Sequence, residues 1–207
     1  MLALKQALSL NTIKNLGSWQ PSDETGLEAW YKYQTGITLN GSDVSAWADS
    51  SENSFNMVQA TASEQPAYNS GAIEFTPADT HNLGSASDIT LSGAFTIGVK
   101  LEPDASNVTV LGSNTTVNEF FKISTSTSLR FKTDGSQIDI TLDSGSFVAD
   151  NYLVITRNAS NLITLYKNGV AQADTETLAG TADINAIGVR RTDLNPYDGT
   201  ISEIQIF

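Results

Sequence analysis

Hydrophobic and polar residues alternate with a period of two along most of the chain after about residue 20. Residues 95–101 show this most clearly, because every second position is Phe, Ile, Val or Leu and the positions between are small or polar. Residues 137–143 repeat the pattern, and 129–131 gives a shorter example. Since successive side chains of a strand point to opposite faces, the pattern predicts half-buried β-strands.

Three further signals describe how these strands are arranged. Residues 152–156 are apolar on both faces at their centre, which is typical of a strand in the middle of a sheet. The pair Asn168 and Gly169 between two strand-like segments predicts a tight type I′ hairpin, since both central residues of that turn need positive φ. In the last expected strand, 199–207, the alternation slips by one residue, which predicts a bulge near Ser202.

The first 20 residues follow a different pattern. They are apolar, contain few turn-forming residues and fit neither the helical nor the strand period, and Pro21 then breaks any continuing element. We therefore expect an amino-terminal arm at 1–20 and one β-sandwich domain at 21–207. The arm is too apolar for a purely disordered tail, so we predict that it docks on a neighbouring subunit. The docking side chains would be Leu4, Leu8, Leu10 and Ile13. The alternative is a terminal segment that packs across its own sandwich or stays disordered.

Composition excludes several classes of function. The chain has 207 residues with 11 Lys and Arg against 23 Asp and Glu, a net charge of −12, which argues against nucleic acid as a partner. There is no cysteine, so disulfides and thiolate chemistry are excluded. No apolar run is long enough to span a bilayer, and Lys5 and Gln6 make the amino terminus a poor secretion signal. We expect a soluble protein without membrane insertion.

Several short motifs occur in an order that carries a family resemblance. They are LEAWYK at 27–32, VSAWADSSEN at 44–53, QP at 65–66, IEF at 73–75, LYKNG at 165–169, IG at 187–188 and YDGTISEI at 197–204. In this order they resemble the concanavalin A-like lectin/glucanase superfamily in its laminin G-like form, over about residues 26–207.

The resemblance implies an all-β fold, a jelly-roll sandwich of two curved antiparallel sheets. In such proteins the concave face or the rim loops often bind glycans, in some cases through calcium. Similar single domains behind a short apolar arm also occur in structural proteins of tailed bacteriophages. A virion location would reconcile an extracellular type of fold with the absence of a recognisable leader and of disulfides.

The aromatic residues divide into expected core and expected surface positions. Trp30 and Trp47 belong to the family pattern, so we interpret them as core or edge-sealing residues. Four tyrosines are better candidates for carbohydrate binding, because each combines an apolar face with a polar tip. These are Tyr31, Tyr33, Tyr68 and Tyr197.

The chain lacks the catalytic pattern of the glucanases in this superfamily, which carry carboxylates at alternate positions of one strand. The nearest approach is Glu102 and Asp104, but Pro103 between them suits the end of a strand. His81 is the only histidine and lies in a loop-like stretch, so composition argues against a triad or a zinc site. We therefore name no catalytic residue and no metal ligand.

Calcium stays an open alternative, because it accepts loop oxygens without a fixed spacing. The candidate loops are those at Asp43, at Asp49–Asn53 and at Asp193–Asp198. We favour the interpretation that their Asp and Asn side chains shape turns through local hydrogen bonds.

Together these observations predict a non-enzymatic virion structural or decoration protein with a lectin-like domain. Its partners would be other virion proteins or copies of itself, bound through the arm, and host-surface or environmental glycans are a further expected ligand. The alternatives are a secreted or cell-surface carbohydrate-binding module and, less favoured, a divergent glycoside hydrolase.

Overall fold

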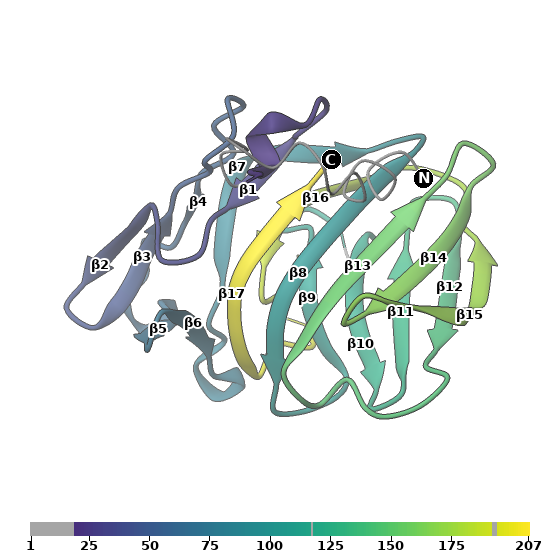
Figure 1. Ribbon diagram of the computed structural model, residues 1–207. Helices are drawn as coiled ribbons and strands as arrows, with labels where there is room; N and C mark the ends of the chain where they lie inside the picture. Colours follow the sequence, from purple (N-terminus) through teal and green to yellow (C-terminus); the bar gives the residue numbers. More distant parts are fainter. Residues whose placement is uncertain (1–18, 117, 192–193) are drawn as a thin grey trace, which may run out of the picture.

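Two antiparallel layers of strands face each other across one apolar core (Figure 1). The computed structural model describes residues 19–116, 118–191 and 194–207. Within these ranges the chain forms seventeen strands and three 3-10 helices, η2 (Pro21–Asp23), η3 (Ala62–Glu64) and η4 (Pro77–Asp79). No helix in this part of the chain is long and apolar enough to cross a bilayer. The predicted docking residues Leu4, Leu8, Leu10 and Ile13 lie outside the described residues.

The front layer of Figure 1 contains six strands, each hydrogen-bonded to the next. In spatial order they are β1 (Ala29–Tyr31), β17 (Gly199–Ile206), β8 (Phe95–Pro103), β13 (Asn151–Arg157), β14 (Leu162–Lys167) and β15 (Val170–Thr177).

The back layer also contains six strands in ladder order. They are β7 (Leu83–Leu91), β16 (Ala182–Ile187), β9 (Val108–Gly112), β10 (Phe120–Thr125), β11 (Ser128–Lys132) and β12 (Gln137–Thr141).

Five short strands join the two layers along one side. They are β2 (Ile37–Asn40), β3 (Asp43–Trp47), β4 (Met57–Val58), β5 (Ala67–Asn69) and β6 (Ala72–Phe75). Since β6 pairs with β17 and β4 pairs with β7, the hydrogen-bonded ladder continues from one layer into the other. The fold is thus the all-β, two-sheet antiparallel sandwich of jelly-roll type that the sequence predicts.

Alternation along the strands builds the core, as predicted. In β8 the side chains of Phe95, Ile97, Val99 and Leu101 are buried, and the positions between them face outward. β13 lies between β8 and β14 and is therefore an inner strand.

Both predicted irregularities of the backbone are also confirmed. Asn168 and Gly169 form the turn between β14 and β15 with φ of 51° and 81°. In β17 the register shifts between Ile201 and Glu203, which places the expected bulge at Ser202.

Side chains rather than a ladder close the opposite side of the sandwich, where β12 and β15 meet. Asp174 Oδ2 accepts a hydrogen bond from the amide of Thr141 at 2.7 Å. Asp143 Oδ2 accepts one from the amide of Ala173 at 3.0 Å. These carboxylates occupy backbone donors that an open sheet edge would offer to another chain.

A buried arginine holds one end of the sandwich together. Arg157, at the end of β13, is 2% exposed, and its guanidinium lies 4.7 Å from the ring centre of Phe95. It donates to the carbonyls of Gly93 and Gly180, the latter at 2.8 Å, and at 3.4 Å to those of Leu91 and Leu178. The carbonyl of Leu91 ends β7, and the other three lie in the β7–β8 and β15–β16 connections, which both run between the layers. Burial lowers the pKa of Arg157.

We predict that Arg157→Met destabilises the fold strongly. The variant keeps an apolar stem but leaves the carbonyls of both connections without their donor, which should lower the free energy of unfolding by about 3 kcal/mol. Urea denaturation measures the effect, with Lys167→Met at a half-exposed cation on β14 as the matched control. Equal stability of the two variants would contradict the role assigned to Arg157.

Candidate functional site

Two of the four tyrosines predicted to bind carbohydrate are fully buried, so the prediction is wrong for Tyr31 and Tyr197. Tyr31 points into the core, where its ring centre lies 5.6 Å from that of Trp47 and its hydroxyl donates to the carbonyl of Phe55 at 2.6 Å. The hydroxyl of Tyr197 donates to the carbonyl of Thr200 at 3.3 Å. Burial raises the pKa of both phenols. Neither ring offers a face to a sugar.

The other two tyrosines are accessible and stay predictions. Tyr33 is 46% exposed in the connection between β1 and β2, and its hydroxyl accepts a hydrogen bond from Gln34 Nε2 at 3.1 Å. Tyr68 is half-buried on β5 and packs against the edge of the core. β5 belongs to the group of short strands at the side of the sandwich (Figure 1), and Tyr33 lies in the connection that leads into this group.

Asp49, a candidate calcium ligand, is occupied by protein donors. Its Oδ1 accepts from the amides of Trp30 and Ser51, both at 2.8 Å. Its Oδ2 accepts from Ser51 Oγ at 2.6 Å and from the amide of Phe55 at 3.0 Å. Four hydrogen bonds use the acceptor positions of a carboxylate. Asp49 therefore holds the 49–55 loop against β1, which supports the turn-shaping interpretation.

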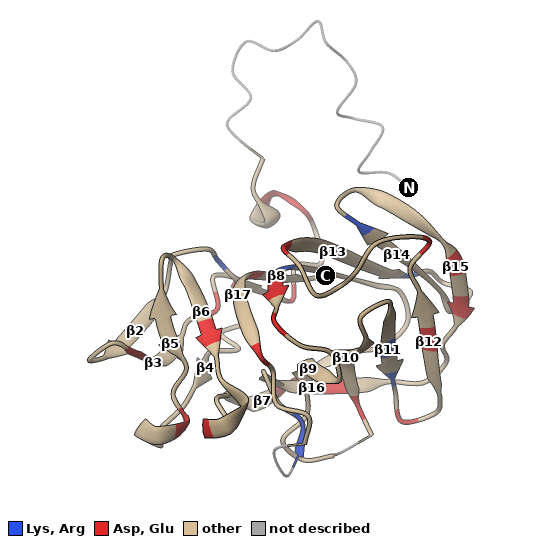
Figure 2. Cartoon of the chain, turned by 90° about the horizontal axis from the view of Figure 1, so that it is seen from below, with Lys and Arg blue, Asp and Glu red and all other residues tan. Residues whose placement is uncertain are grey.

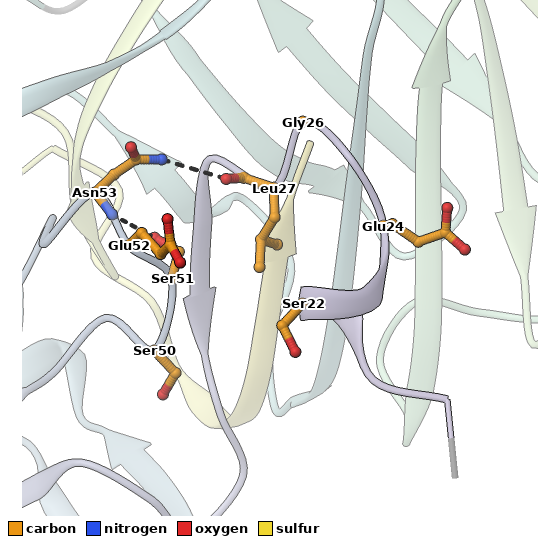
Figure 3. A pocket seen from close by; sticks show the side chains of 8 residues that line it. All are labelled: Ser22, Glu24, Gly26, Leu27, Ser50, Ser51, Glu52 and Asn53. Atoms are coloured by element: carbon orange, nitrogen blue, oxygen red, sulfur yellow. Dashed lines mark hydrogen bonds between the residues drawn. The ribbon is translucent and has the colours of Figure 1, made fainter. Parts of the chain in front are cut away.

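A hollow of about 310 Å³ lies beside this loop (Figure 3). Its lining consists of Ser22, Glu24, Gly26, Leu27, Ser50, Ser51, Glu52 and Asn53. The carboxylates of Glu24 and Glu52 lie on opposite sides of it, and Asn53 Nδ2 donates across to the carbonyl of Leu27 at 3.2 Å. The acidic groups of the hollow therefore do not converge on a common point.

The remaining calcium candidates do not form a cluster either. Asp43 Oδ1 accepts from Ser42 Oγ at 3.1 Å, and Asp193 lies outside the described residues. Partial burial, and then the charge of Asp104, raises the pKa of Asp198. Throughout residues 19–116, 118–191 and 194–207, no three His, Cys, Asp or Glu residues are grouped so that they could hold a metal ion.

His81 has a structural environment. Its Nδ1 accepts a hydrogen bond from the amide of Thr76 at 3.0 Å, and its Nε2 lies 3.8 Å from Asp79 Oδ2. These contacts close the turn around η4.

The outer face of the front layer carries a row of residues that the sequence alone does not mark as a site. The strand register places Trp30 of β1 opposite Gln205 of β17, Gln205 opposite Gly98 of β8, Gly98 opposite Val154 of β13, and Val154 opposite Tyr166 of β14. We call these five residues the outer row. Its centre is a glycine on an inner strand, and aromatic residues stand at both ends.

Tyr152 covers the centre of the outer row. Its side chain leaves β13 beside Lys100 and reaches over Gly98, because a Cβ atom at position 98 would lie 3.0 Å from Tyr152 Oη. An aromatic ring that shields a strand glycine is a known stabilising device in sheets. Tyr152 is nevertheless 36% exposed. Burial, and then the charge of Glu203, raises the pKa of Tyr152, so its hydroxyl keeps its proton and can donate.

Polar contacts fix the β1 end of the outer row. Glu203 Oε1 accepts from Trp30 Nε1 and from Gln205 Nε2, both at 2.9 Å. Lys32 Nζ lies 4.6 Å from the ring centre of Trp30. Trp30 is 5% exposed, so it is a wall of this face rather than a platform, whereas Trp47 belongs to the core as predicted. Side chains that hold each other in this way are ordered before a ligand arrives.

A second hollow, of about 490 Å³, continues this face toward the carboxyl terminus. It is lined by Thr25, Gly26, Ala94, Phe95, Thr96, Thr156, Arg157, Asn158, Tyr166 and Phe207. Thr96 and Thr156 are direct partners across β8 and β13, and Tyr166 also belongs to the outer row. The volume falls in the range of small-ligand sites. We call the outer row, Tyr152 and this hollow together the outer-face site, which offers hydroxyls, an amide and aromatic surface.

The positions of the site were recognisable only in part from the sequence. Tyr152 belongs to a segment that is apolar at its centre, which hides the fact that Tyr152, Val154 and Thr156 share one face. The sequence does not mark Gly98 either, because it occupies one of the small or polar positions of a clearly alternating strand. Only the pairing of β8 with β13 brings the two segments together.

Comparison with known proteins places the chain in a family. Residues 69–207, more than half of the chain, match a family model described as the concanavalin A-like lectin/glucanases superfamily. The chain belongs to this superfamily. The match confirms the predicted resemblance for that range, and the motifs at 27–32, 44–53 and 65–66 lie before it. The matched range, 69–207, contains Gly98, Tyr152 and Gln205 of the outer-face site.

Solved structures agree with the superfamily fold. Domain 4 of AbnA, an extracellular arabinanase from Geobacillus stearothermophilus in complex with arabinotriose, has a TM-score of 0.59 and 17% identity, covering 87% of this chain and 91% of that one. The binding domain of Paraclostridial mosquitocidal protein 1 has a TM-score of 0.59 and 15% identity, covering 91% of this chain and 49% of that one.

The sialidase of Trypanosoma rangeli has a TM-score of 0.53 and 15% identity, covering 89% of this chain and 30% of that one. This superfamily chain thus spans about half the length of the mosquitocidal binding domain and less than a third of the sialidase. At these identities the likeness shows the fold alone. Comparison with curated protein sequences gives no significant match.

We predict that Asp49→Ala lowers the free energy of unfolding by about 3 kcal/mol, because three backbone amides and one hydroxyl lose a charged acceptor. Glu52→Ala is the matched control, since it removes an exposed carboxylate from the same loop. Thermal unfolding with added calcium and with a chelator measures both variants and the parent chain. A midpoint that calcium raises in the parent chain but not in Asp49→Ala would contradict the structural role and restore Asp49 as a ligand.

Proposed function

We propose that the chain is a non-catalytic carbohydrate-binding module that binds a neutral glycan at its outer-face site. One observation carries the proposal: the hydroxyl end of the exposed Tyr152 ring lies over Gly98, beside Gln205, on the strand face that also carries Thr96 and Thr156 of the second hollow. This combination of aromatic surface and neutral polar groups on an ordered sheet face suits a sugar ring.

The chemistry of the site matches that of a sugar in two respects. A pyranose or furanose has an apolar C–H face, which packs well on an aromatic ring, and its hydroxyls both donate and accept hydrogen bonds. Gln205, Thr96 and Thr156 supply uncharged donors and acceptors of the complementary kind. The arabinanase domain whose structure contains arabinotriose has a similar fold over most of this chain, which supports the proposal.

Charge favours a neutral glycan over an acidic one at this site. The chain has a net charge of −12, and Glu203 stands within the site. An acidic sugar would therefore meet like charge both at long range and at close contact.

The arrangement of carboxylates supports binding without hydrolysis. Glycoside hydrolysis normally uses two carboxyl groups that flank one glycosidic bond at about 5 to 10 Å from each other. Among the described residues that line the second hollow, no side chain carries a carboxylate. Glu203 accepts two hydrogen bonds, and Asp150 is paired with Lys100.

The virion location stays a prediction from the sequence. In that setting the module would be displayed on a particle and would contact glycans of the host surface or of the surroundings. Mass spectrometry of purified particles tests this location, and detection only in a secreted fraction would support the alternative of a secreted binding module.

We predict that Tyr152→Ala lowers the affinity for a neutral oligosaccharide by about tenfold, since one aromatic stacking contact contributes about 1 to 1.5 kcal/mol. Isothermal titration calorimetry against a panel of neutral oligosaccharides that includes arabinotriose measures the affinity. Tyr33→Ala, at an exposed tyrosine on the side of the sandwich, is the matched control.

A second variant tests whether binding depends on the position of the Tyr152 ring and not only on its presence. Gly98→Ala keeps Tyr152 but places a Cβ atom against its hydroxyl, so binding should weaken while the fold is retained. Loss of binding in Tyr33→Ala, with Tyr152→Ala unaffected, would move the site to the rim.

A further inference from the structure

Basic side chains gather on the outer face of the back layer, opposite the outer-face site. Lys122 of β10 and Arg130 of β11 are direct cross-strand partners, and both point away from the core. Arg190, which follows β16, places its guanidinium 4.3 Å from the ring centre of Phe120. In Figure 2, blue marks basic residues on β11. With Lys132, these residues are four of the 11 Lys and Arg in a strongly acidic chain.

We call Lys122, Arg130 and Arg190 the basic face, and its geometry is well defined. Phe120 is 3% exposed and forms its apolar floor. Lys122 Nζ lies 6.0 Å from the centre of that ring, so two cations share one aromatic support. Cations held over a ring in this way are fixed in position before a ligand binds.

Lys122 is the residue that most needs a ligand of opposite charge. It is 6% exposed, although lysine is rarely buried without a carboxylate partner. Among the described residues its Nζ has one hydrogen-bond acceptor, Asn107 Oδ1 at 2.7 Å, whereas an ammonium can donate three hydrogen bonds. Burial, and then the charges of Arg190 and Arg130, lowers the pKa of Lys122.

The neighbouring carboxylate, that of Asp139, is paired with Arg130 and not with Lys122. Asp139 of β12 forms two parallel hydrogen bonds with Arg130, from Nε and from Nη2, both at 2.8 Å. A carboxylate that is bound in this fork neutralises Arg130 in preference to Lys122. Among the described residues, no carboxylate is paired with Lys122 Nζ.

We propose that the basic face is a second binding site, which takes a single oxyanion carried on a sugar, such as the carboxylate of a uronic acid. A long polyanion fits less well, because the net charge of −12 repels it beyond the immediate contact. The anion would accept from Lys122 Nζ above the Phe120 floor. This site lies on the opposite outer face of the sandwich from Tyr152 and does not depend on the neutral-glycan proposal.

Titration of the full chain with methyl glucuronide, followed by amide NMR shifts and calorimetry, tests the proposal. We expect shifts at β10 and β11 and an affinity that falls as salt rises. Methyl glucoside, which lacks the carboxylate, should leave β10 and β11 unchanged. Lys122→Met should lower the affinity for the glucuronide at least about tenfold, and the variant should fold because an apolar side chain replaces a buried charge.

Lys167→Met on β14 is the matched control, because it removes a lysine from outside the basic face and should bind the glucuronide as the parent chain does. Equal binding of glucuronide and glucoside, or no shift at β10 and β11, would overturn the proposal. Inorganic sulfate that binds as tightly as the glucuronide would also overturn it, since the sugar would then contribute nothing. Tyr152→Ala should leave glucuronide binding intact, so failure here is distinguishable from failure of the outer-face site.

Discussion

The insertion of the last strand, β17, into the front layer is the constraint on which the rest of the structure depends. β17 pairs with β8 along one edge and with β1 and β6 along the other. Its bulge shifts the alternation by one residue, so that Ile201 and Ile204 both face the core. Without that shift, one half of the strand would turn its apolar side chains to solvent. The layer is therefore completed only when β17 is in place.

The same register produces the outer-face site. Trp30, Gly98 and Gln205 come from the beginning, middle and end of the described chain, yet they stand side by side because β1, β17 and β8 are neighbours. Gly98 has no conspicuous role within its own strand. It becomes informative when β13 pairs with β8 and the ring of Tyr152 comes to lie over it. The site is thus a property of strand order.

This dependence explains what could and could not be predicted from the sequence. Period-two alternation, the Asn168 turn and the phase slip near Ser202 are local signals, and the structure confirms each. Trp30 and Tyr31 are adjacent aromatics in a strand of three residues, so alternation alone does not say which faces the core, and the surface prediction for Tyr31 is wrong for this reason. Tyr197 was misplaced for a related reason, since a turn-like context hid its contact with the core.

The two outer faces carry different chemistry although the same alternation creates them. Inward positions are set by core packing, where a change of volume costs stability, but outward positions away from special contacts tolerate substitution within about 0.5 kcal/mol. A sandwich can therefore present uncharged and aromatic groups around Tyr152 on one face and cations around Lys122 on the other without altering its core. Arg157 and Asp49 are the exceptions, because their polar groups bind backbone and stabilise the fold itself. The two sites proposed for recognition thus consist of residues that do not pack in the core.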